Sequence, residues 1–268
     1  MTMIEITYNN QKKEIPGCLE ELSPHRYYRY LELVLMMNAG EISPFQMRCK
    51  LLSSLLGMKH NFLLCQPQIQ EELLSQLSKL DGFFDITHPG DTAVYDARLK
   101  TGRNLLPSCK GWTGPGDMLD GITFGEFIGC MGILAGMEHA ASQEGEAVVG
   151  DLISAIGSLL YKKRDSQEPG TPPFTVCFHA YVFFCAVWEL VCSVPIFTNG
   201  REVDFSILFE DSHRHHAGDN TGWVGISYDV AASGVFGNFT QVNDTPFWDV
   251  MLYLYKCRFE MLHNNKEQ

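Results

Sequence analysis

Helix-start signals recur along this chain, and they constrain its fold more than any other feature. Ser23-Pro24 and Ser43-Pro44 each place a capping hydroxyl before a proline whose fixed φ suits the first helical turn. Thr123-Phe124-Gly125-Glu126 has the spacing of a capping box. Apolar residues recur at three- and four-residue steps after each signal, which is the pattern of an amphipathic helix. The sequence therefore predicts a mainly α protein.

The remaining local patterns predict where individual elements lie. Ile4–Tyr8 and Gln11–Ile15 alternate around Asn9-Asn10, which predicts an N-terminal β-hairpin. Short strands are expected within 83–86 and 92–95. The expected helices run from Pro24 to about Met37, from Pro44 to about Gly57, from Pro67 through Leu80, over Phe124–Met137, over Glu144–Tyr161, over Trp223–Ala231, and onward from Pro246 behind a Thr245 cap.

A change of composition divides the chain. Gly, Pro, Asp and Thr are frequent from Asp81 to Asp120, and the strong helical pattern resumes only afterwards. We place a boundary near residue 110, which gives two helical lobes at 1–110 and 111–268, with the hairpin in the first. In the second lobe Gly129, Gly132 and Gly136 lower helix propensity, and close approach of a neighbouring helix is the expected compensation.

The apolar run from Phe174 to Phe197 has two interpretations. Its length suffices to cross a bilayer, which needs about 20 residues, so membrane association is one alternative. However, His179 and Glu189 would lie inside the hydrocarbon, and Pro195 interrupts the end. We therefore expect a buried core helix with His179 as a hydrogen-bonded core histidine, in a protein that stays soluble without detergent.

Charge and cysteine content exclude several classes of partner. Lys and Arg number 20 against 32 Asp and Glu, a formal charge of −12, and the longest basic run is Lys162-Lys163-Arg164. A nucleic-acid or anionic-membrane binder needs clustered cations, so neither partner is expected. The start Met1–Glu5 lacks a basic and apolar leader, and nine cysteines without Cys-x-x-Cys spacing are typical of reduced cytosolic thiols.

The chain offers little that could carry catalysis. His213-Arg214-His215-His216, with Asp211 and Asp219 nearby, is the local cluster of metal-ligand types, and a metal-dependent hydrolase using the His213–His216 region is the alternative function. No second ligand set accompanies it, so a solvated loop without stoichiometric metal is expected. Cys109 has no histidine in a familiar catalytic relation to it. We therefore expect no enzyme, no cofactor and no metal site.

The last predicted helix is the candidate contact surface. Its aromatic residues include Phe247, Trp248 and Tyr253, and they point in more directions than one core-facing stripe accommodates. Because aromatic residues concentrate at interface centres, we predict these three as partner-binding residues, with Trp248 and Tyr253 as anchors. The alternative is that they close the core of the second lobe.

Three blocks of the chain together resemble uncharacterised phage and prophage proteins. They are Thr123–Ile128 running on to Leu159–Lys162, Gly234–Asn238 running on to Asp249–Leu254, and the opening Ile15-Pro16, Glu21–Pro24 and Tyr28. Proteins of that kind are associated with tail modules, near the tape-measure protein, where tail-assembly chaperones are expected. The resemblance implies a non-enzymatic structural or assembly protein in the host cytoplasm or the virion. Its expected partners are another virion or tail protein, the tape-measure protein among them, or a second copy of the chain.

Overall fold

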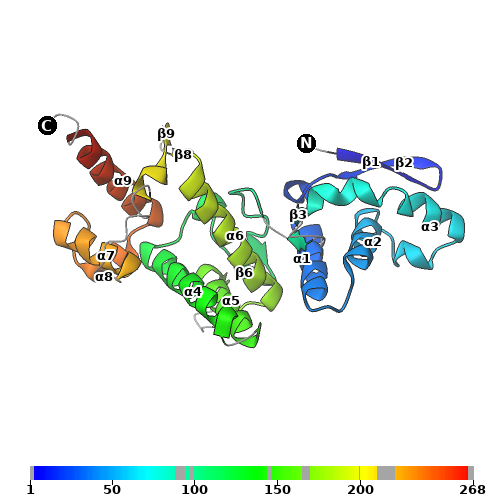
Figure 1. Cartoon of the computed structure of the whole chain (residues 1–268), viewed down its shortest axis with the longest axis horizontal. Coiled ribbons are helices and arrows are strands. Elements are labelled where there is room, and N and C mark those ends of the chain that lie inside the picture. The colour runs from blue at the N-terminus through cyan, green and yellow to red at the C-terminus, as the bar shows by residue number, and fades with distance from the viewer. Residues whose placement is uncertain are drawn as a thin grey trace. The chain divides into compact units, whose positions relative to one another are not determined.

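The chain is mainly α-helical and forms two compact units, Met1–Lys100 and Thr101–Gln268 (Figure 1). The computed structural model describes residues 3–87, 94–96, 99–143, 146–164, 170–198, 200–209 and 221–264. The predicted fold class is confirmed. We refer to the two as unit 1 and unit 2 and describe each by itself.

Unit 1 opens with the predicted hairpin. Strands β1 (Met3–Tyr8) and β2 (Gln11–Pro16) pair antiparallel, with Tyr8 opposite Gln11. Asn9 and Asn10 both have positive φ, at 53° and 59°. A two-residue turn of this kind matches the strand twist, and asparagine tolerates positive φ better than most residues. The hairpin is therefore determined locally.

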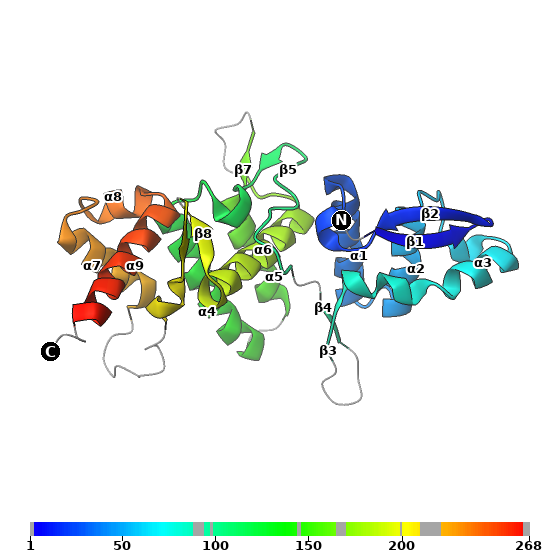
Figure 2. The same cartoon turned by 90° about the horizontal axis from the view of Figure 1, so that it is seen from above.

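The helices of unit 1 begin where the sequence predicts. Helix α1 (Pro24–Asn38) is capped by Ser23, and α2 (Pro44–Leu55) has a complete capping box between Ser43 and Gln46. Helix α3 (Pro67–Leu74) is shorter than expected, because the chain breaks at Ser75 and continues as the 3-10 helix η3 (Leu77–Phe83). Two shorter 3-10 helices are η1 (Leu19–Glu21) and η2 (Phe62–Leu64), and Figure 2 shows the same elements from above.

Unit 1 ends after a short antiparallel pair, β3 (Asp85–Thr87) and β4 (Val94–Asp96). The division falls between Lys100 and Thr101, ten residues before the boundary placed near 110. The segment after Lys100 belongs to unit 2 because Asn104 is hydrogen-bonded to Pro115 and Tyr161 there. Local composition could not report those bonds, which join residues that are far apart in sequence.

Three apolar helices form the centre of unit 2 (Figures 1 and 2). They are α4 (Phe124–Gln143), which starts at the predicted Thr123–Glu126 capping box, α5 (Glu146–Leu160) and α6 (Phe174–Ser193). A Cβ at Gly129 would lie 3.0 Å from Leu159, so that glycine does permit close packing. Gly132 and Gly136 face open space, and the expectation of close approach is wrong there.

Helix α6 is shorter than the apolar run that predicted it. It ends at Ser193 because Val194 precedes Pro195 and is extended, at φ −136° and ψ 148°. The rest of the run enters a small hairpin, β8 (Ile196–Thr198) with β9 (Arg201–Val203), followed by η5 (Phe205–Leu208). Helix α6 has the length and composition of a membrane span, and 61% of its most apolar window is buried within the protein.

Shorter strands and helices complete unit 2. Strands β5 (Ser108–Cys109), β6 (Trp112–Thr113) and β7 (Lys162–Lys163) form a sheet, and η4 spans Asp117–Leu119. The chain closes with α7 (Gly222–Ser233), α8 (Phe239–Asp244) and α9 (Phe247–Asn264). Helix α8 was not predicted. The expected Thr245 cap is wrong because Thr245 is the C-terminal cap of α8, where its hydroxyl donates to the Gln241 carbonyl, and α9 begins only at Phe247.

Candidate partner-binding groove

The three residues predicted to bind a partner lie at the start and middle of α9. Phe247 is 1% exposed, and its ring lies 4.6 Å from that of Phe127 in the core. This burial corrects the expectation for Phe247, because a side chain with no accessible surface cannot contact a partner in this state. The first turn of α9 packs inward since α4 and α9 lie side by side in unit 2.

Trp248 and Tyr253 are half-buried and packed against unit 2. The indole N–H of Trp248 donates to the carbonyl of Met118 at 2.9 Å, and its ring lies 5.6 Å from that of Phe205. Tyr253 packs edge-on against Phe236 at 5.6 Å. Both side chains therefore contribute to closing unit 2, and a role for them in partner binding stays a prediction.

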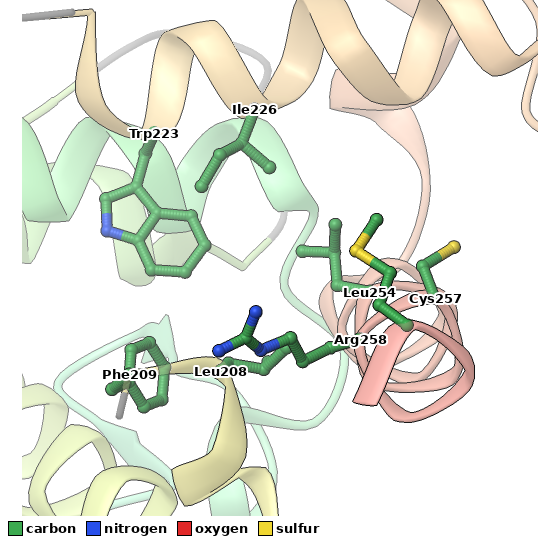
Figure 3. Close-up of a pocket in the computed structure, with 8 residues that line it drawn as sticks. Leu208, Phe209, Trp223, Ile226, Leu254, Cys257 and Arg258 are labelled. Atoms are coloured by element: carbon green, nitrogen blue, oxygen red, sulfur yellow. The ribbon is translucent and has the colours of Figure 1, made fainter. Parts of the chain in front are cut away.

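An apolar groove lies farther along α9, where η5, α7 and α9 face one another (Figure 3). Its volume is about 310 Å³. Among the described lining residues, Arg258 is charged and the others are apolar or cysteine. The lining consists of Leu208, Phe209, Trp223, Ile226, Leu254, Cys257, Arg258 and Met261.

The groove exists because α9 continues its apolar stripe beyond the core. Val250 and Met251 are fully buried, whereas the next members of the stripe, Leu254, Cys257 and Met261, line the groove. Their spacing of three, four and seven residues keeps them on one helical face. Met261 is 59% exposed. The last turns of α9 thus present an apolar face that unit 2 leaves uncovered among its described residues.

Aromatic packing holds the opposite wall in place. The ring of Trp223 lies 4.9 Å from Phe127, 5.6 Å from Trp188 and 6.4 Å from Phe209, mostly edge to face. Edge-to-face contacts of this kind fix ring orientation as well as burying area. The Arg258 Nε–H donates to the carbonyl of Ile207 at 3.3 Å, which ties α9 to η5. The walls are therefore formed before any ligand arrives.

Other candidate chemistry is weak in the described residues. Burial raises the pKa of the half-buried Cys109 thiol, and the lowering effect of neighbouring Lys110 is smaller, so Cys109 is a poor nucleophile. Burial raises the pKa of Cys130 further, to about 12. Across the described ranges no three His, Cys, Asp or Glu side chains gather as a metal site would need. His213, His215, His216, Asp211 and Asp219 lie outside the described residues.

One buried polar cluster surrounds the predicted core histidine. His179 is fully buried, and its Nε2 lies 2.9 Å from Oδ1 of Asn104, as the sequence interpretation of a hydrogen-bonded core residue requires. Burial lowers the pKa of His179 to about 3. Tyr161 donates to the carbonyl of Leu106 at 2.8 Å in the same cluster. His179 has no accessible surface, so the cluster contributes to the packing of unit 2.

The predicted contact residues and the groove lie on the same helix, α9, at different turns of it. The available signal was the stripe of Leu254, Cys257 and Met261 after the aromatic residues, which continues apolar for two more turns. The contributions of Leu208 and Trp223 had no signal in the sequence, because they come from separate segments brought together by the fold. No protein-family model matches the chain, and no curated protein or solved structure matches it significantly.

Proposed function

We propose that the protein is a non-enzymatic structural or assembly protein of a phage-derived tail and that it binds an amphipathic helix of another tail protein. The observation that carries the proposal is the groove between η5, α7 and α9. An apolar stripe of one helix laid into such a groove is a recurrent mode of protein recognition, anchored at positions three, four and seven residues apart. The resemblance to tail-module proteins provides the biological setting.

The sequence next to the groove favours an occupant from another protein. The segments of this chain outside the description that adjoin the groove elements are 210–220 and 265–268, and their sequence is polar apart from Ala217. Neither can fill an apolar groove without burying unpaired polar groups, which costs free energy. An apolar face on a partner helix has no such cost and gains about 25 cal/mol for each Å² of apolar surface it buries.

The negative charge of unit 2 indicates which residues should flank the apolar face of the partner helix. Residues 101–268 contain 10 Lys and Arg against 20 Asp and Glu, a formal charge of 10 − 20 = −10. Complementary potential accelerates association and selects among partners. The proposed occupant is therefore a helix with an apolar face and basic flanks. The tape-measure protein of the same tail is the first candidate to supply it.

Substituting Met261 tests the groove. Met261→Asp places a charge at an exposed groove position, and we expect it to weaken binding of the tape-measure protein by about 2 kcal/mol, or roughly 30-fold. Val235→Asp is the matched control, since Val235 has the same exposed fraction of 59% in unit 2 but does not line the groove. Calorimetric titration of the purified full chain measures both affinities.

The proposal fails if the two variants bind with equal affinity or if the wild type does not bind. Sedimentation of the chain alone distinguishes the remaining occupant. Concentration-dependent self-association that Met261→Asp abolishes and Val235→Asp preserves would assign the groove to a second copy of the chain and overturn the tail-protein assignment.

A further inference from the structure

Unit 1 contains a polar pocket whose chemistry differs from that of the groove in unit 2. It has a volume of about 390 Å³ and lies between α1, the end of α2, and the loop that leads into η2. Arg29, Lys50, Lys59 and His60 all contribute to its lining. Among the described residues no Asp or Glu lines it, although the whole chain has 32 acidic residues against 20 basic ones.

The cations of this pocket exceed their counter-charges. Arg29 pairs with Glu32 at 2.7 Å. Lys50 and Lys59 form no ion pair within the part of the chain that the structure describes. Three permanent cations against one carboxylate leave a formal charge of 3 − 1 = +2 with His60 counted as neutral.

Helix stabilisation does not account for this charge. The end of α2 carries only about −0.5 of an elementary charge. Its last carbonyls are also already bonded, because Gly57 donates to Ser54 at 3.1 Å and Met58 donates to Ser53 at 2.9 Å. Gly57 makes this closure possible with φ of 71°. The lysine ammonium groups are therefore not needed as caps.

The uncharged polar groups of the pocket also favour an anion. The side-chain amide oxygen of Asn61 (Oδ1) accepts from the Leu63 N–H at 3.2 Å, which leaves the two hydrogens of the same amide as donors. Ser54 adds a hydroxyl that can donate. Because every polar side chain available here can donate, a ligand with several acceptor oxygens suits the pocket best.

We propose that this pocket binds a small phosphate monoester. The phosphate of such an ester carries about −1.5 to −2 charges at pH 7 and three acceptor oxygens, which matches the formal charge of +2 and the donor set. A single phosphate group is far smaller than 390 Å³, so the organic part has room beside it. Met58 and Leu64 provide apolar walls for that part, and Leu64 is 79% exposed.

Phenyl phosphate is the probe for this proposal, titrated into the full chain by calorimetry with inorganic phosphate for comparison. We expect saturable binding with one site per chain, tighter for phenyl phosphate than for inorganic phosphate. The double substitution Lys50→Gln with Lys59→Gln should weaken binding at least about tenfold, since each lost charge-assisted hydrogen bond contributes more than a neutral one. Lys256→Gln is the control, because that lysine is exposed in unit 2.

Four outcomes would overturn the proposal. They are the absence of saturable binding, an equal loss of affinity in the Lys256→Gln control, inorganic phosphate binding as tightly as the ester, and duplex DNA competing at the same lysines. Circular dichroism of each variant verifies that it is folded before titration. Because the pocket is in unit 1, these outcomes are independent of the Met261→Asp result on the groove.

Discussion

Each unit uses one buried side-chain amide to fasten a non-helical segment to a helical region, and the two amides differ in their partners. In unit 1, the Gln76 amide donates to the carbonyls of Thr7 and Glu72, both at 2.9 Å. Its oxygen accepts from the Thr7 N–H at 2.9 Å and from Lys79 at 3.2 Å. Gln76 thereby holds the hairpin against the segment that links α3 and η3.

The equivalent residue of unit 2 is Asn104. Its amide donates to Pro115 at 2.7 Å, and its oxygen accepts from the Leu106 N–H at 2.9 Å. The same oxygen contacts His179 Nε2 at 2.9 Å and the Tyr161 hydroxyl at 3.4 Å. Because the oxygen can only accept, we assign the imidazole proton to Nε2.

Burial of His179 makes the stability of unit 2 sensitive to acid. Three of the four Gln76 bonds involve backbone groups, and the fourth involves the Lys79 side chain. The Asn104 cluster includes His179, which burial keeps neutral by lowering its pKa to about 3. All four tryptophans, Trp112, Trp188, Trp223 and Trp248, are in unit 2, so tryptophan fluorescence reports that unit alone.

The largest expected effect is that of Asn104→Ala. The substitution removes the side-chain partner of the buried Leu106 N–H and of the Pro115 carbonyl, at about 1–3 kcal/mol for each unsatisfied group, and it removes one contact of the His179 ring. We expect the free energy of unfolding of unit 2 to fall by about 4 kcal/mol, measured by urea titration with tryptophan fluorescence. A loss below about 1 kcal/mol would show that Asn104 does not organise unit 2.

The second largest expected effect is that acidification lowers the free energy of unfolding of unit 2 more than that of unit 1. His179 has a folded pKa of about 3, below its unfolded value of about 6.5, so the unfolded state binds more protons between these values. Its contribution is therefore fully present above pH 6.5. It falls by about 1.4 kcal/mol per pH unit as the pH is lowered, so that about 3 kcal/mol is lost at pH 4.5.

The control for acidification is His179→Gln, whose amide can replace the Nε2–H donor without titrating. Urea titrations at several pH values, followed by tryptophan fluorescence, should show a steeper loss of stability in the wild type than in this variant. Equal pH slopes in the two proteins would mean that His179 is not held neutral by burial.

The smallest expected effect is that of Gln76→Ala in unit 1. The residue is 8% exposed and water can reach part of its site, so we expect a loss of about 1–2 kcal/mol. The change should appear in circular dichroism, which senses both units, and leave the tryptophan transition in place. A matching shift of the tryptophan transition would show that the two units unfold together and that their stabilities cannot be compared separately.

Most predictions that rest on neighbouring residues were right, and predictions that rest on distant residues were right less often. Ser23, Ser43 and the Thr123–Glu126 pair cap the expected helices because a cap bonds a backbone N–H two or three positions away. The close helix approach predicted at Gly132 was wrong, because the residues next to a glycine in sequence do not determine whether another helix packs against it. The helix cap predicted at Thr245 was wrong because the unpredicted helix α8 ends there, and the Thr245 hydroxyl donates to the Gln241 carbonyl of that helix.

In the groove too, some features follow from local sequence and others depend on tertiary structure. The apolar stripe of α9 could be predicted from sequence, since its period is a property of consecutive residues. Which part of the stripe is buried depends on where the core ends. Phe247 lies against Phe127, while Met261 lies beyond the core, and only the folded unit sets that limit. The opposite wall, with Trp223, comes from a separate helix.

The sequence by itself determined the helical class, most helix starts, the Asn9-Asn10 turn and the buried character of His179. Each depends on hydrogen bonds or apolar periodicity within a few residues. The tertiary structure decided the end of unit 1 at Lys100, the pairing of Asn104 with His179 across 75 residues, and the two cavities. Such features depend on which distant side chains meet once apolar surface is buried, and burial is non-directional, so local sequence patterns do not specify them.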